Sequence, residues 1–488
     1  MPCTTILVGK KASYDGSTMI ARTDDGHFDV KKLITVDPAK QPRKYTSVAG
    51  KLTIELPDNP MRYTSSPNVD PKEGVWPATG INECNVGMTA TETITTNPRV
   101  LGADPMVRYQ KAKKRGEKDI PGGIGEEDMC LLVLPYIHTA REGVLRLAEL
   151  LEKYGTYESN GIAFNDKDEI WWLETIGGHH WMARRVRDEE VVIMPNQFGM
   201  DYFDFDDAFG DRENYMCSAD MPGFISENHL DLNVLSYEFN PRNVFGSHSD
   251  SDHVYNTPRA WYMGRYLAPT TRSWEGNDPD YTPTSDDIPW SFSPERKVTV
   301  EDIKYLLSSH YQGTPYDPYL QKDSGKRGIY RSIGINRTGV MAILQIRGYM
   351  PKPLQGIEWV CFGPTTFDTV LPVYTAVKQI PEYLSKVSTD VSTDNFYWCS
   401  RLLAALADPI FGTAIPMVER YQLSVPAQAH AILKEYDKKI AETGNTALCE
   451  EANTKLCEMA KTETQKLLNE LVLKASENMK DGYHRWDN

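Results

Sequence analysis

Short runs of apolar and β-branched residues alternate with glycine, proline and polar turns through the first half of the chain. Residues 4–13 (TTILVGKKAS) and 16–25 (GSTMIARTDD) are two such runs, and they flank Tyr14-Asp15-Gly16. An Asp-Gly pair between two strand-like runs is a strong signal for a β-hairpin. The pattern therefore predicts an antiparallel hairpin that brings Cys3, at the start of the first strand, close to Arg22 on the second.

Further strand-like segments follow along the chain and predict extensive antiparallel sheet. They are 81–93 (INECNVGMTATET), 161–186 (GIAFNDKDEIWWLETIGGHHWMARRV), 189–198 (EEVVIMPNQF), 339–347 (GVMAILQIR) and 356–364 (GIEWVCFGP). The sequence contains no internal repeat and no low-complexity tract.

Helical spacing of apolar residues appears in two places. From Asp128 to about Tyr154 it predicts one long helix with a kink at Pro135. From about Asp394 the composition changes, and a long amphipathic helix is expected at the chain's end. Its apolar face consists of Leu448, Ala452, Leu456, Met459, Leu467, Leu471 and Ala475. Such a face packs either on the rest of the chain or on a sister subunit, and the second possibility favours a homo-oligomer.

Residues 201–300 have weak periodicity and are rich in proline, aspartate and aromatic residues, which predicts a loop-rich insertion. Two strings in this region, DYFDFDD (201–207) and HSDSDH (248–253), contain carboxylates and histidines that suit metal ions. Neither has the ligand spacing of an EF-hand loop or of a zinc motif. No metal is therefore expected.

Composition and charge narrow the class of protein. The 488 residues are 40% hydrophobic and 25% charged, without a run of eighteen apolar residues, which is typical of a globular protein with no membrane span. The start shows no basic segment followed by an apolar one, so the cytoplasm is the expected compartment. The formal charge of -15 disfavours nucleic acid and anionic membrane as partners and is compatible with small substrates that carry a free amine.

The candidate chemistry lies at the start of the chain. Eight scattered cysteines without a C-x-x-C pair indicate reduced thiols, and the motifs of serine hydrolases, zincins, P-loop proteins and Rossmann folds are absent from the sequence. A cysteine at a mature N-terminus has a base built in, because the α-amino group titrates near pH ~8 and can accept the thiol proton. For Cys3 this chemistry requires the removal of Met1 and Pro2.

Several strings, in order along the chain, carry a resemblance to a known family. Cys3 precedes the first strand, Asp15-Gly16-Ser17 forms the turn, and 21–25 (ARTDD) lies on the second strand. Together with GINECNVGMTATET, EIWWLETIGGHHWMARRV, MPNQF and YNTPRAWYMGRY, they resemble the N-terminal-nucleophile (Ntn) hydrolases. Within these, the chain is similar to the dipeptidase A and secernin family, relatives of choloylglycine hydrolase and penicillin V acylase. The resemblance implies an α+β fold, an αββα sandwich of two antiparallel sheets flanked by helices.

The resemblance also implies roles for five residues. Cys3 matches the nucleophile, and its freed amino group would be the general base. Arg22 matches the arginine beside the thiol, and Asp25 matches the carboxylate that orients the amine. An offset of three places these two on opposite faces of a regular strand, so the strand must end or bend between them. Asn196 matches a donor to the oxyanion, and Arg259 matches a second active-site arginine.

Glu92 is a departure from the family pattern. It stands where the bile-salt enzymes place another oxyanion asparagine. A carboxylate at this position favours a substrate-binding role, in which it holds the free ammonium of a dipeptide. A surface or structural carboxylate is the alternative.

Each of the five matched residues also has an ordinary structural interpretation. Cys3 alone would be a buried small hydrophobe, and Arg22 with Asp25 would be a surface ion pair. Asn196, which follows a proline, would be a turn residue, and Arg259 would lie in a helix N-terminal cap.

The expected function is hydrolysis of the amide bond of dipeptides, with broad side-chain tolerance, through a thioester acyl-enzyme and without a cofactor. An amidase acting on a non-peptide N-acyl amide, such as a conjugated bile acid or an acyl homoserine lactone, is one alternative. A catalytically silent scaffold protein is another. The expected organisation is a removable leader at 1–2, a catalytic domain at 3–390 that includes the insertion, and a helical region at 391–488 packed on it.

Overall fold

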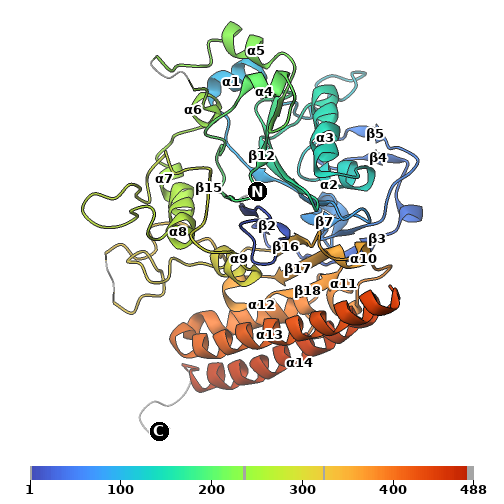
Figure 1. Ribbon diagram of the computed structural model, residues 1–488, viewed down its shortest axis with the longest axis vertical. Coiled ribbons are helices and arrows are strands. Elements are labelled where there is room, and N and C mark those ends of the chain that lie inside the picture. The colour runs from blue at the N-terminus through green and yellow to red at the C-terminus, as the bar shows by residue number, and fades with distance from the viewer. Residues whose placement is uncertain (1–2, 235–237, 323–324, 481–488) are drawn as a thin grey trace.

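The computed structural model describes residues 3–234, 238–322 and 325–480, and it combines antiparallel sheets with helices (Figure 1). The α+β class predicted from the sequence is confirmed. The predicted leader, Met1 and Pro2, lies outside the described residues.

Two large antiparallel sheets form the centre of the molecule. The first has the strand order β15 (Ser291–Phe292), β13 (Val191–Met194), β1 (Cys3–Val8), β2 (Thr18–Asp24), β16 (Val340–Ile346), β17 (Gly356–Phe362), β18 (Leu371–Tyr374). The second has the order β14 (Tyr215–Cys217), β12 (Trp181–Val186), β11 (Ile170–Thr175), β10 (Asn160–Asn165), β8 (Gly87–Thr89), β7 (Thr79–Ile81), and β9 (Glu92–Thr93) also pairs with β10. Two small ribbons pair β3 (Ile34–Val36) with β6 (Tyr63–Ser65) and β4 (Lys44–Thr46) with β5 (Thr53–Glu55).

The predicted N-terminal hairpin is confirmed. β1 and β2 are antiparallel neighbours, and Cys3 lies opposite Asp24 while Thr5 lies opposite Arg22. Gly16 in the connecting turn has φ +86°, a left-handed conformation that glycine adopts without steric cost. The turn residues therefore fix the register that places Cys3 near Arg22.

The two sheets pack face to face, and helices cover their outer faces. Leu7 and Ile20 of the first sheet share one apolar cluster with Ile81 and Trp172 of the second. On the far side of the second sheet, α3 (Ala140–Tyr154) packs on β10, β11 and β12, and on the far side of the first sheet α9, α12, α13 and α14 pack on its strands (Figure 1). The order of layers is helix, sheet, sheet, helix.

Besides α3, the helices are α1 (Pro98–Ala103), α2 (Met129–Val133), α4 (Phe205–Phe209), α5 (Met221–Glu227), α6 (Pro241–Phe245), α7 (Asp252–Tyr255), α8 (Thr257–Leu267), α9 (Val300–Leu307), α10 (Lys352–Gln355), α11 (Glu382–Ser385), α12 (Phe396–Ala407), α13 (Phe411–Thr443) and α14 (Leu448–Glu477). Short 3₁₀ turns are η1 (Pro38–Lys40), η2 (Pro71–Glu73), η3 (Leu134–Tyr136), η4 (Thr365–Phe367) and η5 (Asp408–Ile410). Several of the short helices, and α8, lie in the 201–300 region that the sequence pattern marked as loop-rich.

The prediction of one kinked helix over 128–154 is wrong. The segment forms α2, the 3₁₀ turn η3 around Pro135, and a separate helix α3. Pro135 cannot donate a backbone hydrogen bond, and the Thr139 side chain caps a new helix by accepting the Glu142 N–H at 3.1 Å. The proline thus separates two helices where a kink was expected.

The C-terminal helices share a core with the first sheet. Of the predicted apolar face of α14, Ala452 and Leu456 lie in one cluster with Trp359 of β17. Asn453 accepts the Tyr374 N–H at 2.8 Å and donates to the Tyr374 carbonyl at 3.0 Å, so it satisfies the edge of β18. Because this face packs within the chain, the pattern that favoured a homo-oligomer is explained without one, and the oligomeric state stays a prediction.

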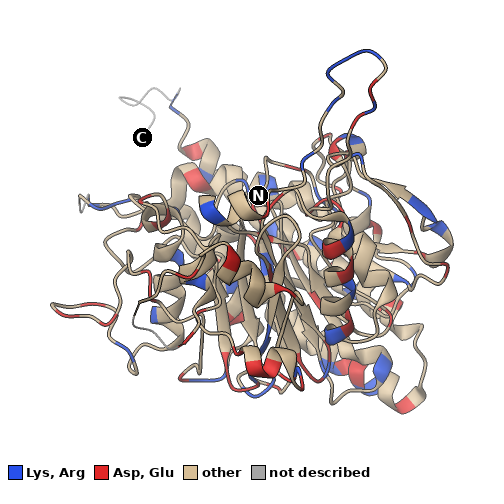
Figure 2. Cartoon of the chain, turned by 90° about the horizontal axis from the view of Figure 1, so that it is seen from above, with Lys and Arg blue, Asp and Glu red and all other residues tan. Residues whose placement is uncertain are grey.

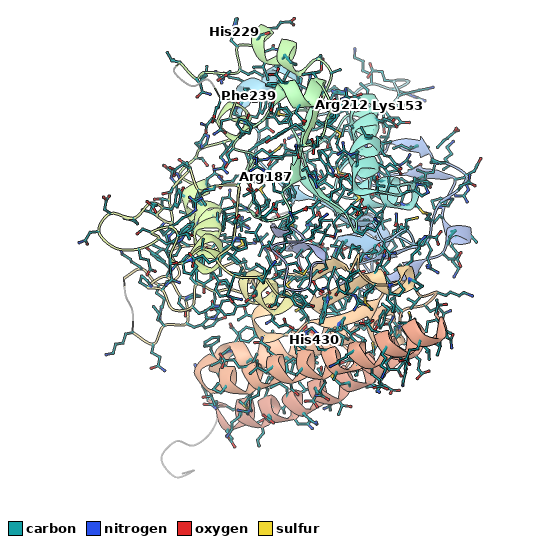
Figure 3. The ribbon with its side chains drawn as sticks, viewed as in Figure 1. Lys153, Arg187, Arg212, His229, Phe239 and His430 are labelled. Carbon is teal, nitrogen blue, oxygen red and sulfur yellow. The ribbon has the colours of Figure 1, made fainter. Side chains whose placement is uncertain are left out.

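The contact between α13 and the first sheet includes a polar pair. His430, labelled in Figure 3, has its Nε2 atom 2.7 Å from a Glu301 carboxylate oxygen of α9, and its ring lies 5.1 Å from the Trp359 ring. Since these contacts join α13, α9 and β17, the helical layer is held by side chains from several segments.

One helical stretch, Phe396–Thr443, is long and apolar enough to cross a membrane by length and composition alone, with a mean hydropathy of 1.4 over an 18-residue window. The core helices of soluble proteins pass the same test. The stretch comprises α12, η5 and α13, and its Leu403 and Val418 pack with Leu471 of α14. The expected absence of a membrane partner stays a prediction.

Acidic and basic residues are interspersed over the helices and loops (Figure 2). This distribution accompanies the net charge of -15. An interspersed, net acidic surface offers little attraction to a polyanion. The expected absence of a nucleic-acid partner stays a prediction.

Candidate active site

The register of the hairpin shows which face of the first sheet each of the first side chains of β1 occupies. Because Cys3 lies opposite Asp24 and Thr5 lies opposite Arg22, these four side chains share the face that packs on the second sheet. Thr4 points the other way, toward α8. The start of the strand therefore presents the thiol to one layer and a hydroxyl to the next.

The thiol side of the site is built around a buried arginine. Arg22 donates to Cys3 Sγ at 2.9 Å and to the Ala78 carbonyl at 3.1 Å, and it forms an ion pair with Glu126. Burial raises the pKa of the Cys3 thiol well above its ordinary value, while Arg22 lowers it and the neighbouring carboxylates raise it. The predicted approach of Cys3 and Arg22 is confirmed.

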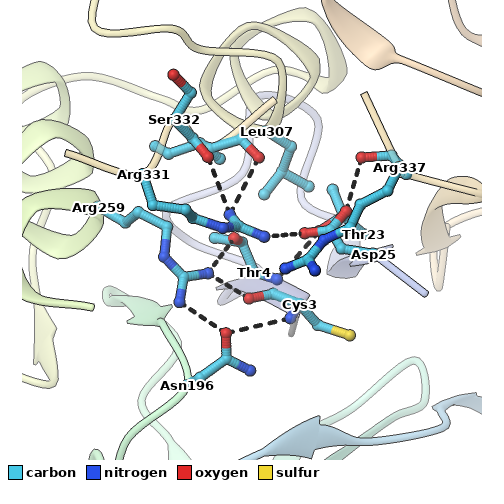
Figure 4. Close-up of polar contacts among 12 residues, drawn as sticks. Cys3, Thr4, Thr23, Asp25, Asn196, Arg259, Leu307, Arg331, Ser332 and Arg337 are labelled. Carbon is cyan, nitrogen blue, oxygen red and sulfur yellow. Dashed lines mark hydrogen bonds and ion pairs between the residues drawn. The ribbon is translucent and has the colours of Figure 1, made fainter. Parts of the chain in front are cut away.

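The backbone of Cys3 is held by two of the predicted residues (Figure 4). Its N–H donates to Asn196 Oδ1 at 3.2 Å, and Arg259 donates to its carbonyl oxygen. Arg259 also donates to Asn196 Oδ1 and to Thr4 Oγ1, each at 2.7 Å. Asn196 Oδ1 therefore lies beside the nitrogen that would be the α-amine of a chain beginning at Cys3.

The amide nitrogen of Asn196 is already engaged. It donates to Glu92 Oε1 at 2.8 Å and to the Thr93 carbonyl at 2.9 Å. Asn196 Oδ1 faces hydrogen-bond donors and Asn196 Nδ2 faces acceptors, so these contacts fix the orientation of the side-chain amide. Donation to an oxyanion, the role predicted for Asn196, would require Nδ2 to release one of these partners.

Asp25 lies on the opposite side of β2 from Arg22. The strand ends at Asp24, but this end does not bring Asp25 to the face of Arg22. Asp25 accepts from Thr338 Oγ1 at 2.6 Å and from Thr23 Oγ1 at 3.3 Å, and it forms an ion pair with Arg331. The Thr23 hydroxyl also accepts the Thr4 N–H at 3.0 Å, so Asp25 reaches the nucleophile strand through Thr23.

Glu92 is fully buried and belongs to the same network. Its Oε2 accepts from Thr5 Oγ1 at 2.7 Å, and its Oε1 accepts from Asn196. Burial raises the pKa of Glu92 from 4.5 to about 7, although Arg259 and Thr5 lower it. A surface position, one of the alternatives for Glu92, is excluded, and its predicted contact with a substrate ammonium stays untested.

We expect Glu92→Gln to become more stable relative to the wild type as the pH rises. The raised pKa means that folded Glu92 retains a proton that the unfolded chain has lost, so the stability of the wild type falls between pH 4.5 and 7. Glutamine does not ionise. The difference in free energy of unfolding between variant and wild type should therefore grow by about 3 kcal/mol from pH ~4.5 to pH ~8.

Denaturant unfolding at several pH values measures this difference. Glu83→Gln, at an exposed glutamate, is the matched control for replacing a glutamate by glutamine, and the difference for Glu92→Gln should exceed any change that this control shows. A constant difference for Glu92→Gln as well would show that folding does not raise the pKa of Glu92.

The structure adds charged residues that the sequence did not point to. Asp24 forms a buried ion pair with Lys31 at 2.7 Å, and Glu126 and Arg331 pair with two predicted residues. Glu126 comes from the Gly-rich loop 121–128, which showed no catalytic motif. The only available signal was that this loop carries three consecutive acidic residues.

Three groups at the site are of the kind that bind metals. Cys3 Sγ and one oxygen each of Asp24 and Glu126 lie within 4.8 Å of one another. Both carboxylates already pair with a cation, Lys31 and Arg22, which would repel a divalent ion. We assign no metal to the site.

The six predicted residues form one connected site. Arg22 contacts the thiol, Asn196 and Arg259 contact the backbone of Cys3, and Glu92 contacts Asn196, while Asp25 is linked through Thr23. The arrangement combines a thiol, a cation beside it and an ordered strand terminus. A thiol with a cation beside it, on an ordered strand, is suited to nucleophilic acyl transfer.

Comparisons with known proteins find similar sequences along most of the chain. Residues 2–424, which include all six predicted site residues, match the family described as Peptidase family C69. A dipeptidase of Bifidobacterium longum (strain NCC 2705) is 58% identical over 452 residues, 92% of this chain and 85% of that protein. A probable dipeptidase A of Streptococcus pyogenes serotype M3 (strain SSI-1) is 50% identical over 487 residues, 99% of each chain. Dipeptidase A of Lactobacillus helveticus is 45% identical over 446 residues, 90% of this chain and 88% of that protein.

Proposed function

Because the chain belongs to peptidase family C69, we propose that it is a dipeptidase whose nucleophile is the thiolate of Cys3, exposed as the N-terminal residue after removal of the leader. The observation that carries the proposal is the position of Cys3 at the start of β1. Its sulfur lies 2.9 Å from Arg22 and its backbone nitrogen lies 3.2 Å from Asn196 Oδ1. We assign the four-layer architecture to the Ntn-hydrolase αββα fold.

The proposed reaction is acyl transfer in two halves. The α-amine of Cys3 takes the thiol proton, and the sulfur bonds to the carbonyl carbon of the dipeptide. When the oxyanion collapses, the C–N bond breaks and the leaving amine takes the proton from the α-ammonium. Water, deprotonated by the same amine, then hydrolyses the thioester, which releases the first amino acid and restores the thiol.

The surrounding residues take distinct parts in this proposal. Arg22 stabilises the thiolate, because a cation 2.9 Å away opposes the effect of burial on the thiol pKa. Asn196 Oδ1 accepts a hydrogen bond from the amine and so orients it, while Arg259 holds the Cys3 carbonyl. Backbone amides are the proposed donors to the oxyanion, joined by Asn196 if its Nδ2 releases Glu92.

We extend the proposal to dipeptides with varied side chains and to a cytoplasmic location. All eight cysteines lie in the described part of the chain and none of them forms a disulfide. This supports a reducing compartment, where thiol chemistry persists.

Mass spectrometry of the intact purified protein tests the proposed base. We expect the wild type to begin at Cys3 and Cys3→Ala to retain Pro2, because the thiol itself would attack the preceding carbonyl. Cys84→Ala, which changes a cysteine remote from the hairpin in sequence, should be processed like the wild type. An active wild type that retains Pro2 would contradict the α-amine as base.

A further inference from the structure

We propose that Asp24 and Glu126 form the subsite for the free α-ammonium of the substrate, directly beside the Cys3 thiol. This subsite rests on the proposed function, since it names the part of the site that recognises the N-terminal half of a dipeptide.

The position of Asp24 is the first reason. It lies opposite Cys3 in the hairpin, so the two side chains share one face of the sheet. One carboxylate oxygen of Asp24 and one of Glu126 lie within 4.8 Å of Cys3 Sγ and of each other. The two acidic groups thus surround the sulfur from β2 and from the loop that precedes α2.

An unused acceptor on Asp24 is the second reason. Its Oδ2 contacts Lys31 Nζ at 2.7 Å, but its Oδ1 has no hydrogen-bond donor among the described residues, although the side chain is 2% exposed. A buried carboxylate oxygen without a donor is costly. An incoming ammonium group supplies the missing donor.

The geometry of a dipeptide is the third reason. Two bonds separate the α-nitrogen from the scissile carbonyl carbon, which places them about 2.5 Å apart. The attacking sulfur approaches that carbon to about 3–3.5 Å. The ammonium must therefore lie within about 6 Å of Cys3 Sγ and about 2.8 Å from its acceptors. Asp24 and Glu126 meet this requirement.

Glu92, the residue named for this role from the sequence, is less suited to it. Both of its oxygens already accept hydrogen bonds, from Thr5 and from Asn196. The assignment of the ammonium to Asp24 and Glu126 also has a consequence for specificity. A peptide bond in the interior of a chain, or behind a blocked N-terminus, has no ammonium to offer.

The test compares alanyl-alanine with propionyl-alanine, which replaces the α-ammonium by hydrogen. We expect the wild type to prefer alanyl-alanine by about 100-fold in kcat/KM, as suits a charged hydrogen bond in a buried site. Glu126→Gln and Asp24→Asn should each lower the ratio of kcat/KM for alanyl-alanine to that for propionyl-alanine by at least about tenfold. A loss of activity that affects both substrates equally does not change this ratio. Glu358→Gln, at a buried glutamate that accepts from Thr64 and Thr79 instead, is the matched control and should keep the wild-type ratio.

Three outcomes would overturn the subsite. The first is equal hydrolysis of both substrates by the wild type, and the second is a wild-type ratio of kcat/KM for the two substrates in both variants. The third is loss of alanyl-alanine hydrolysis when a chelator is added, which would assign the carboxylates to a divalent ion. The wild-type ratio needs no variant, so recognition of the α-ammonium can be refuted even if Asp24→Asn or Glu126→Gln folds poorly. Suppose that the wild type hydrolyses alanyl-alanine and propionyl-alanine with equal kcat/KM and that alkylation of Cys3 abolishes both reactions. The proposed subsite would then be wrong, while the proposed function would stand.

Discussion

Replacing Cys3 by alanine is expected to abolish dipeptide hydrolysis and to leave the fold intact. The variant loses the only atom that forms a bond to the substrate in the proposed reaction, and removal of a covalent nucleophile lowers kcat by at least about 10⁴-fold. The fold should survive because alanine fits the space, and Arg22 keeps Glu126 and the Ala78 carbonyl as partners. Hydrolysis of alanyl-alanine, followed by release of free alanine, measures the loss.

Two further variants sharpen this result. Cys3→Ser tests whether sulfur is needed, and we expect it to be nearly as inactive, because a hydroxyl is far harder to ionise than a thiol. Cys84→Ala, which also removes one thiol, should keep wild-type activity. Full activity in Cys3→Ala would overturn the mechanism, whereas an inactive and unfolded protein would be recognised by its circular dichroism spectrum.

Replacing Arg259 by methionine is expected to have the second largest effect, on activity and stability together. The guanidinium is fully buried, and burial lowers its pKa to about 10, so it remains charged at neutral pH. It donates five hydrogen bonds, to the Tyr255 and Cys3 carbonyls, to Thr4 Oγ1, and to the Oδ1 atoms of Asn196 and Asn256. Methionine removes all five donors, although Asn196 Oδ1 and Asn256 Oδ1 each keep one backbone N–H donor. We expect the free energy of unfolding to fall by about 3 kcal/mol or more, and kcat/KM by at least about 10³-fold.

The control for Arg259→Met lies on the same helix. Arg265 of α8 pairs with Glu275 at 2.9 Å at a partly exposed position. Arg265→Met should cost less than about 1 kcal/mol, as is usual for surface ion pairs, and should keep wild-type kcat/KM. Denaturant unfolding and kinetics on alanyl-alanine measure both variants. A stable and active Arg259→Met protein would show that Arg259 does not position Cys3.

In the proposed mechanism, one residue serves as nucleophile and as base, and the two groups of Cys3 that take these parts have different neighbours. The thiol of Cys3 points to the second sheet, where Arg22 and carboxylates set its charge. Its backbone nitrogen meets Asn196 Oδ1, which Arg259 of α8 also holds. A strand terminus between two layers can therefore be stabilised independently on the sulfur side and on the nitrogen side.

The parts of the site that the sequence predicted are those encoded locally. The hairpin follows from an Asp-Gly turn between two apolar runs, and its register alone brings Cys3 to Arg22. The expected end or bend of the strand between Arg22 and Asp25 did not bring the two side chains to one face, since they lie on opposite sides as in a regular strand. The C-terminal helix was predicted because its apolar residues repeat with helical period. Asn196, Arg259 and Glu92 were found by resemblance to a family, and no local pattern would have connected them with Cys3.

Only the tertiary structure decided which distant groups share the buried space around Cys3. Glu126 meets Arg22 across more than a hundred residues of sequence, and its loop carries no motif. The break at Pro135 depends on the cap at Thr139, and the apolar face of α14 turned out to cover the first sheet of its own chain. Periodicity shows that a face is buried, but it does not show against what. Hydrogen bonds and ion pairs between distant segments depend on how whole layers pack. By itself, the sequence determined the hairpin and the candidate nucleophile, Cys3. The packing of the sheets and helices determined which charged groups surround Cys3.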